Sequence, residues 1–241
     1  YVKNQLVGPN RDPEFPEPER LIAKQNGRGT PANVAVQKDF GSENFQIGTN
    51  HVHGCTVVVA VSETSVYMSH IWEVEALRGK DTLDGRTQQA FKARVLDFLD
   101  GTSTAQSSPT LQKGIGPGID ATKFAAGTQA HIMTPLIENE ATGTYGPGIQ
   151  YPNKVAAIVG HIRPKLGNVE AVTRSYTPLD FDTDDNGNVV RDPAKPDSSI
   201  ADTNAKGMVL FQYHAATGAW RLFIEERRFE GKKNTGGKKR K

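Results

Sequence analysis

Residues 55–72 read CTVVVAVSETSVYMSHIW, and this stretch decides the fold class. Its two halves, 55–61 and 66–72, are rich in valine and in other residues that are typical of β-strands. The polar residues 62–65 between them are typical of a turn. The stretch therefore predicts a β-hairpin within a β-rich protein.

Further strand candidates lie on both sides of this hairpin, at 34–37, 45–47, 130–137, 155–162, 169–176, 208–214 and 220–229. The clearest helix is 87–99, where Phe91, Val95, Phe98 and Leu99 follow the helical period and Gly101 stands just past the end. Many strands with one strong helix predict an α+β fold with a sheet-on-sheet core.

Along the chain we expect three segments. Residues 1–33 are rich in proline and polar residues and predict an N-terminal arm. Residues 34–230 predict a single domain, and residues 231–241 a basic, flexible tail. Two Gly-Pro-Gly-Ile quartets, at 116–119 and 146–149, are interpreted as turns.

The charge of the chain is unevenly distributed. Its 241 residues carry 29 basic and 27 acidic side chains, and without the six tail cations 23 basic and 27 acidic residues remain, a net charge of −4. A general nucleic-acid-binding domain is thereby disfavoured, because such domains carry basic charge over one face. The tail alone could bind a polyanion or act as a nuclear-targeting signal, or it is a solvated terminus; its cations are Lys232, Lys233, Lys238, Lys239, Arg240 and Lys241.

The chain has one cysteine, Cys55, which excludes an internal disulfide and a cysteine-based zinc cluster. In the predicted hairpin, a turn at residues 62–63 places Cys55 directly opposite His70. A turn at residues 63–64 makes the two diagonal. Both registers put Cys55 and His70 on the same face, with Cβ atoms about 4.5–5.5 Å apart if opposed and about 7–8 Å if diagonal.

A cysteine beside a histidine has a clear chemical use. The thiolate is the nucleophile, a nearby imidazolium lowers the thiol pKa, and the histidine then acts as general acid and base. Gly54 allows a close approach of backbone, and the amides of residues 54–56 would face a developing oxyanion. The alternative is structural, since a cysteine at the start of an apolar strand is often a small buried hydrophobe.

The segment Thr49 … His53-Gly54-Cys55-Thr56 … His70 resembles the active-site signature of the CheD and cytotoxic-necrotizing-factor group of cysteine deamidases, which includes the Burkholderia lethal factor type. That group has a Gly-Cys element at the start of a strand and a histidine on the next strand. Several members carry a threonine a few residues before the cysteine. The toxin motif reads Leu-Ser-Gly-Cys, and this chain departs from it with His53 in place of the serine.

The resemblance implies a β-sandwich-like core flanked by helices and an enzyme that hydrolyses the side-chain amide of a protein glutamine. It implies Cys55 as nucleophile, His70 as proton carrier and Thr49 as the group that orients His70, with Gly54, Thr56 and His53 lining the oxyanion pocket. It also implies no metal or organic cofactor. The expected partner is a protein with an accessible glutamine, and the expected setting is a secreted effector or toxin that acts in a host cell. No apolar run approaches the length of a membrane span.

Other interpretations stay open at this point. The chain could be a non-catalytic β-rich binding module whose tail contacts an acidic partner, or a transglutaminase, or a cysteine protease that pairs Cys55 with His161 or His214. A metal could be held by His51 and His53 together with His131, His161 or His214. Asp182, Asp184 and Asn186 match the first half of a calcium loop, but a polar turn at Asn186-Gly187 is favoured because Pro193 stands where a bidentate glutamate is required.

Overall fold

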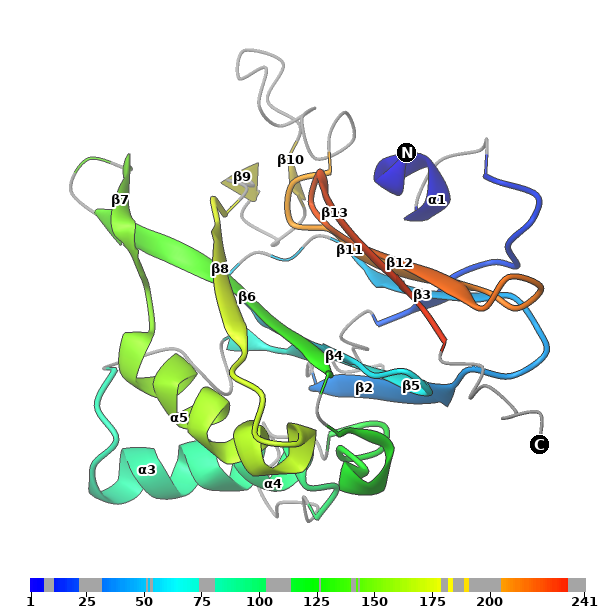
Figure 1. Cartoon of the computed structure of the whole chain (residues 1–241). Coiled ribbons are helices and arrows are strands. Elements are labelled where there is room, and N and C mark those ends of the chain that lie inside the picture. Colours follow the sequence, from blue (N-terminus) through cyan, green and yellow to red (C-terminus); the bar gives the residue numbers. More distant parts are fainter. Residues whose placement is uncertain are drawn as a thin grey trace.

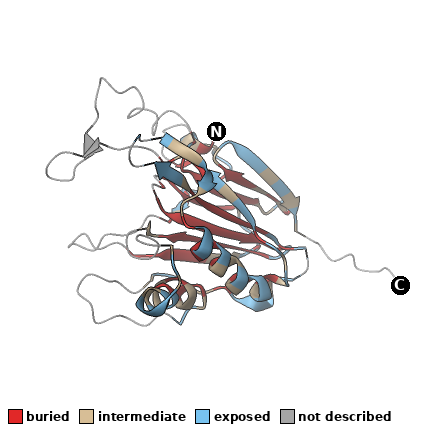
Figure 2. Cartoon of the chain, turned by 90° about the vertical axis from the view of Figure 1, so that its left-hand side faces the viewer, coloured by how far each residue is buried: buried red, intermediate tan, exposed pale blue. Residues whose placement is uncertain are grey.

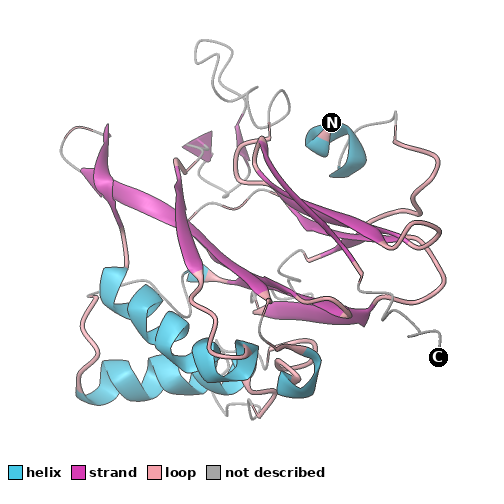
Figure 3. Ribbon diagram, viewed as in Figure 1, coloured by secondary structure: helices cyan, strands magenta, loops and turns pink. Residues whose placement is uncertain are grey.

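The structure is a computed structural model of the whole chain (Figure 1). It describes residues 1–6, 11–21, 32–50, 52, 54–73, 81–102, 114–125, 127–139, 142, 144–178, 182–183, 189–190 and 205–233. Two β-sheets stack face to face, and a layer of helices covers the outer face of one of them (Figures 1 and 3). The predicted α+β class with a sheet-on-sheet core and flanking helices is confirmed.

Within the described residues, the sheet next to the helices has six strands. Its main path runs β2 (Val34–Asp39), β5 (Ser65–Ile71), β4 (Thr56–Val61), β6 (Gln129–Asn139) and β7 (Thr144–Ile149). β8 (Val172–Tyr176) pairs with β6 in parallel. The predicted hairpin is β4 and β5, which form the centre of this sheet.

The second sheet has five strands among the described residues, in the order β1 (Glu19–Arg20), β3 (Phe45–Thr49), β11 (Val209–His214), β12 (Ala219–Ile224) and β13 (Arg227–Lys232). β1 pairs with β3 in parallel, and the other neighbours are antiparallel. The short helix α1 (Val2–Leu6) packs on the outer face, where Leu6 joins Leu210 and Phe223 in a small cluster. A separate pair, β9 (Asp182–Thr183) and β10 (Val189–Val190), is antiparallel.

The helical layer consists of two segments. The first is continuous from 85 to 99: α3 (Gly85–Phe91), a π-helical turn (Lys92–Leu96) and α4 (Asp97–Leu99), which confirms the helix expected at 87–99. The second is α5 (Pro152–Ile162), followed by a 3₁₀ turn (Arg163–Leu166). Another 3₁₀ turn spans Ala121–Lys123. None of the helices within the described residues meets the length and hydrophobicity that a membrane span requires.

α5 contradicts the strand that was predicted at 155–162. The buried residues Val155, Ile158 and Ile162 are separated by three and four positions, so they form one face of a helix that packs on the six-stranded sheet. Proline at the first helical position is a common helix start, because its missing N–H would be unsatisfied there anyway. The β-branched composition of this segment gave the wrong prediction.

Two further predictions are wrong in detail. The strand expected at 220–229 is two strands, β12 and β13, which reverse at a turn where Glu225 has a φ of 55°. The quartet at 146–149 lies inside β7 and is not a turn. β13 also includes residues 231 and 232, the first two of the expected tail, while residues 234–241 lie outside the described part.

The main core lies between the two sheets, and the central strands are buried on both faces (Figure 2). Along β4, Val57 and Val59 face the five-stranded sheet, whereas Val58 and Ala60 face the helices. This alternation follows from the two-residue period of a strand. Cys55 belongs to the core between the sheets, so it has the same orientation as Val57.

Candidate active site

The hairpin register makes Cys55 and His70 diagonal neighbours on one face. Val57 pairs with His70 and Thr56 with Ile71, which is the register expected for a turn at residues 63–64. The hydroxyl of Ser62 fixes this turn, because its Oγ accepts hydrogen bonds from the amides of residues 64 and 65 at 3.2 and 3.0 Å. Cys55 and His70 are both 3% exposed, in the core between the sheets.

The imidazole of His70 is anchored to the opposite sheet. Its Nδ1 lies 2.9 Å from Thr49 Oγ1 and 3.0 Å from the carbonyl oxygen of Leu21. Thr49 ends β3, and its hydroxyl donates to the same Leu21 carbonyl at 2.9 Å. Leu21 directly follows β1, whose pairing with β3 brings its carbonyl to this position. Two strands, β3 and β5, and the residue that follows β1 thus fix the imidazole ring between the two sheets.

This anchoring determines which ring nitrogen carries the proton. A carbonyl oxygen only accepts, so the contact with Leu21 is a hydrogen bond only if Nδ1 is protonated. The neutral ring of His70 then has its lone pair on Nε2. Nε2 is buried and has no hydrogen-bond partner among the described residues. The ring therefore presents a basic nitrogen to the core between the sheets.

Burial also sets the charge of His70. Desolvation lowers its pKa below the ordinary value of 6.5, and the bond to the Leu21 carbonyl only partly opposes this. The imidazole is accordingly neutral at neutral pH. A neutral His70 favours a mechanism in which the imidazole takes the proton of the thiol during the attack. It does not favour the resting pair of thiolate and imidazolium that the sequence alone suggested. Trp72 covers the ring, with centroids 6.2 Å apart and planes 29° from parallel.

The backbone of Cys55 is fixed by Tyr176, the last residue of β8. The Tyr176 hydroxyl donates to the Cys55 carbonyl at 2.8 Å. Burial, and then the nearby Cys55 and Glu73, raise the pKa of Tyr176 well above 10, so the hydroxyl stays protonated and remains a donor. Because C=O and N–H of a trans peptide point in opposite directions, the Thr56 N–H points away from Tyr176.

Gly54 has two structural reasons to be glycine. Its φ is +76°, in the left-handed region that side chains rarely adopt. A Cβ at this position would lie 2.0 Å from Oε2 of Glu73, so the carboxylate occupies the space of a side chain. The Tyr151 hydroxyl, just before α5, donates to the other oxygen of Glu73. An acidic group therefore packs directly beside the residue that precedes the cysteine.

The remaining predicted pocket residues differ in their placement. The Thr56 hydroxyl lies 3.1 Å from Thr134 Oγ1, on the face of β4 that is turned toward the helices. The Thr56 side chain therefore does not line the face that carries Cys55. His53 and His51 lie outside the described residues, as do Asp184 and Asn186. Asp182 is described by its backbone only, in β9. The role of residues 54 and 56 as oxyanion donors stays a prediction.

The other three described histidines each have a partner away from Cys55. His161 on α5 bonds to Asp100 at 2.8 Å in the helical layer, and His214 ends β11 with its Nδ1 3.1 Å from Thr217. His131 on β6 accepts from Arg174 Nε at 3.3 Å. Among the described residues, no three His, Cys, Asp or Glu side chains form a group that could hold a metal ion.

Sequence reasoning missed three groups in this site: the Leu21 carbonyl, the Tyr176 hydroxyl and the Glu73 carboxylate. A backbone carbonyl has no signature in the sequence, and Leu21 lies in the segment expected to be an irregular arm. Tyr176 reaches the site through the pairing of β8 with β6, two strands that are distant in the sequence, whereas Glu73 follows β5, the hairpin partner of β4. A signal existed only for Glu73, which closely follows His70 along the chain.

No protein-family model matches the chain, and no curated protein matches its sequence. Among solved structures, it is similar to the C-terminal domain of CNFy from Yersinia pseudotuberculosis, with 12% sequence identity and a TM-score of 0.27. The match covers 79% of this chain and 54% of that chain, so this chain spans about half the length of the domain it matches. The chain therefore has a weak structural similarity to that domain, which by itself assigns no activity.

Proposed function

We propose that this chain is a cysteine-dependent amidohydrolase that acts on the side-chain amide of a protein glutamine. The observation that carries the proposal is the fixed imidazole of His70, whose Nε2 has no hydrogen-bond partner in the described part of the chain and shares a face with Cys55. The substrate class comes from the resemblance of residues 49–70 to the glutamine deamidases. The substrate would be a protein with an accessible glutamine, modified by a secreted effector.

In the proposed reaction, Nε2 of His70 takes the proton of the Cys55 thiol as the sulfur attacks the carboxamide carbon. Nε2 has no hydrogen-bond partner among the described residues, so the mechanism requires that the sulfur approach it by rotation about the Cα–Cβ bond of Cys55. Such tightening of catalytic hydrogen bonds on substrate binding is common. The carbon–nitrogen bond of the tetrahedral intermediate then breaks. The imidazolium gives its proton to the leaving nitrogen, which departs as ammonia and leaves a thioester.

Water completes the cycle. His70, again neutral, removes a proton from water as it attacks the thioester, and the carbon–sulfur bond breaks to release glutamate and the thiol. Nδ1 stays bonded to Leu21 throughout, and Thr49 limits rotation of the ring. The Cys55 amide and the amide before it are the proposed oxyanion donors, because the Thr56 amide pairs with Ile71 within the sheet. An amine in place of water would give transamidation.

The first test uses the fact that Cys55 is the sole cysteine, so alkylation of the chain by iodoacetamide reports on one thiol. We expect the folded protein to react at pH 6–7, where an ordinary thiol with a pKa of about 8.5 is almost fully protonated. His70→Gln should slow the reaction, and His161→Gln, which changes a histidine in the helical layer, should not. Reaction only after denaturation, or an equal rate in His70→Gln, would overturn the mechanism.

The second test is release of ammonia from an unfolded, glutamine-rich polypeptide, with mass spectrometry to locate the modified residues. We expect conversion of glutamine to glutamate by the wild type and none by Cys55→Ser. Addition of methylamine separates the two outcomes of the thioester, because transfer gives an N-methyl amide whereas hydrolysis gives the acid. Cleavage of backbone bonds would favour the protease alternative.

A further inference from the structure

A second candidate site lies on the outer face of the five-stranded sheet, around Arg221 of β12. The guanidinium carbon of Arg221 lies 5.5 Å from the ring centroid of Tyr1 and 5.5 Å from that of Phe15. Its Nη2 also lies 3.5 Å from the Tyr1 hydroxyl. Contact with two rings holds a guanidinium in place and leaves its N–H groups available to an anion.

Arg221 has no ion-pair partner among the residues that the structure describes. The register places Glu230 of β13 directly opposite, but that carboxylate pairs with Arg228 at 2.6 Å. Arg221 is therefore a half-buried, oriented cation without a direct ion pair in the described part of the chain. The acid close to it is Asp12, whose carboxylate accepts a hydrogen bond from the Tyr1 hydroxyl at 3.2 Å. Such a guanidinium is suited to a bidentate contact with a planar carboxylate.

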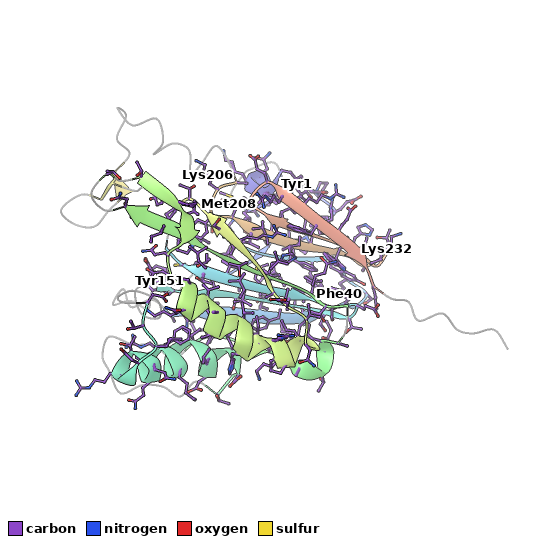
Figure 4. All side chains as sticks on the ribbon, turned by 60° about the vertical axis from the view of Figure 1, so that its left-hand side comes forward. Tyr1, Phe40, Tyr151, Lys206, Met208 and Lys232 are labelled. Atoms are coloured by element: carbon purple, nitrogen blue, oxygen red, sulfur yellow. The ribbon has the colours of Figure 1, made fainter. Side chains whose placement is uncertain are left out.

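A groove of about 530 Å³ opens beside this guanidinium. Phe15, Ala219 and Trp220 give it apolar walls. Three cations, Arg221, Arg228 and Lys232, also line it, together with one carboxylate, Glu230, which pairs with Arg228. Figure 4 shows Tyr1 and Lys232 on this same side of the molecule. We call it the Arg221 groove.

We propose that the Arg221 groove binds an acidic segment of a partner protein, with a side-chain carboxylate seated on Arg221. The three cations of the lining outnumber its one carboxylate, so the groove attracts an acidic segment. The apolar walls accept the side chains of a peptide. β13 is also the last strand of its sheet among the described residues, so its outer edge offers backbone groups to an extended segment.

This site is distinct from the candidate active site and does not depend on the proposed activity. Thr49, which contacts His70, pairs with Val209 at the start of β11. His214, which lines the groove, ends the same strand five residues later, about 17 Å away at the usual rise of a strand. A segment bound in the groove would contact the enzyme away from the reacting glutamine.

The test measures binding of a fluorescein-labelled oligoglutamate peptide to the full chain by fluorescence anisotropy. Arg221→Gln should weaken binding at least about fivefold, because it removes a charged partner of the carboxylate. Arg221→Lys should restore only part of the affinity, since lysine keeps the charge and loses the fork. Arg86→Gln, an exposed arginine of α3, is the matched control and should bind as the wild type does. Circular dichroism checks that each variant is folded, and the exposed Lys232→Gln gives a second loss if Arg221 variants unfold.

Three results would overturn the proposal. Equal weakening by Arg86→Gln and Arg221→Gln would show diffuse attraction without a site. Loss of binding when Lys238, Lys239, Arg240 and Lys241 are changed to glutamine, with no effect of Arg221→Gln, would assign the binding to the tail. Stronger binding of a phosphoserine peptide, displaced by inorganic phosphate, would replace the carboxylate with a phosphate ligand.

Discussion

Replacement of Thr49 by valine isolates the contribution of one hydroxyl to the proposed catalysis. Valine keeps the shape of threonine, so the change removes the 2.9 Å contact with His70 Nδ1 and the 2.9 Å bond to Leu21 without a cavity. Nδ1 retains its 3.0 Å bond to the Leu21 carbonyl, so the tautomer is preserved. Only the second restraint on the ring is lost.

The expected size of the effect follows from that geometry. One hydroxyl hydrogen bond contributes about 0.5–1.5 kcal/mol, which corresponds to roughly a two- to tenfold fall in rate if all of it acts in the transition state. His70→Gln should be far more severe, because it removes the base itself. The assay is the second-order rate constant for alkylation of Cys55 at pH 7, with the free energy of unfolding measured in urea.

Thr134→Val is a matched control for this prediction. Thr134 is also fully buried, and its hydroxyl has a buried side-chain partner, the Thr56 hydroxyl, but it lies on the opposite face of the sheet from His70. It should lower stability by a similar amount and leave the alkylation rate unchanged. If Thr49→Val behaves like this control, Thr49 is a structural residue only. If Thr49→Val slows alkylation as much as His70→Gln does, the bond to the Leu21 carbonyl is not enough to keep the His70 ring in its working orientation.

Three further predictions concern pH and packing. Because burial lowers the pKa of His70, alkylation of the thiol should persist as the pH falls below 6.5, and a rate that falls with an ordinary histidine pKa would contradict this. Burial also lowers the pKa of His131 to about 4, whereas in the unfolded chain the same ring is protonated near pH 6.5. The free energy of unfolding should therefore fall by at most ~3 kcal/mol between pH 6.5 and 4. His131→Gln should remove this pH-dependent loss of stability, measured by urea unfolding at pH 7 and 4.5. Gly54→Ala should destabilise the fold by about 2 kcal/mol or more, because the new Cβ would collide with the Glu73 carboxylate and because the φ of residue 54 is positive. Gly41→Ala is the control: a Cβ there has open space around it, so thermal unfolding should show almost no change in stability.

The sequence predicted the hairpin and the shared face of Cys55 and His70, because alternation along a strand depends only on position. It left two registers open, since residues 62–64 are all polar and either pair can turn. The Ser62 hydroxyl decides between them, and its bonds exist only once the turn has formed. Local propensity failed at 155–162, where the contacts of one helix face with the sheet override the preference of valine and isoleucine for strands.

The anchoring of His70 could be predicted only in part. Thr49 was singled out from its position before the cysteine, but a hydrogen bond between β3 and β5 joins different sheets, and no local pattern encodes how the sheets stack. The Leu21 carbonyl depends on a parallel pairing of a two-residue strand, which is too short to leave a periodic signal.

His131 shows why burial alone does not identify the catalytic histidine. It resembles His70 closely: both are buried, both have a lowered pKa, and in both Nε2 lacks a hydrogen-bond partner among the described residues. Yet Nδ1 of His131 accepts a bond from Arg174, so its proton is on Nε2 and the ring offers no base there. His70 has the reverse tautomer and shares its face with the thiol. A buried nitrogen without a partner costs about 1–3 kcal/mol in either ring, but only that of His70 is a lone pair beside a nucleophile.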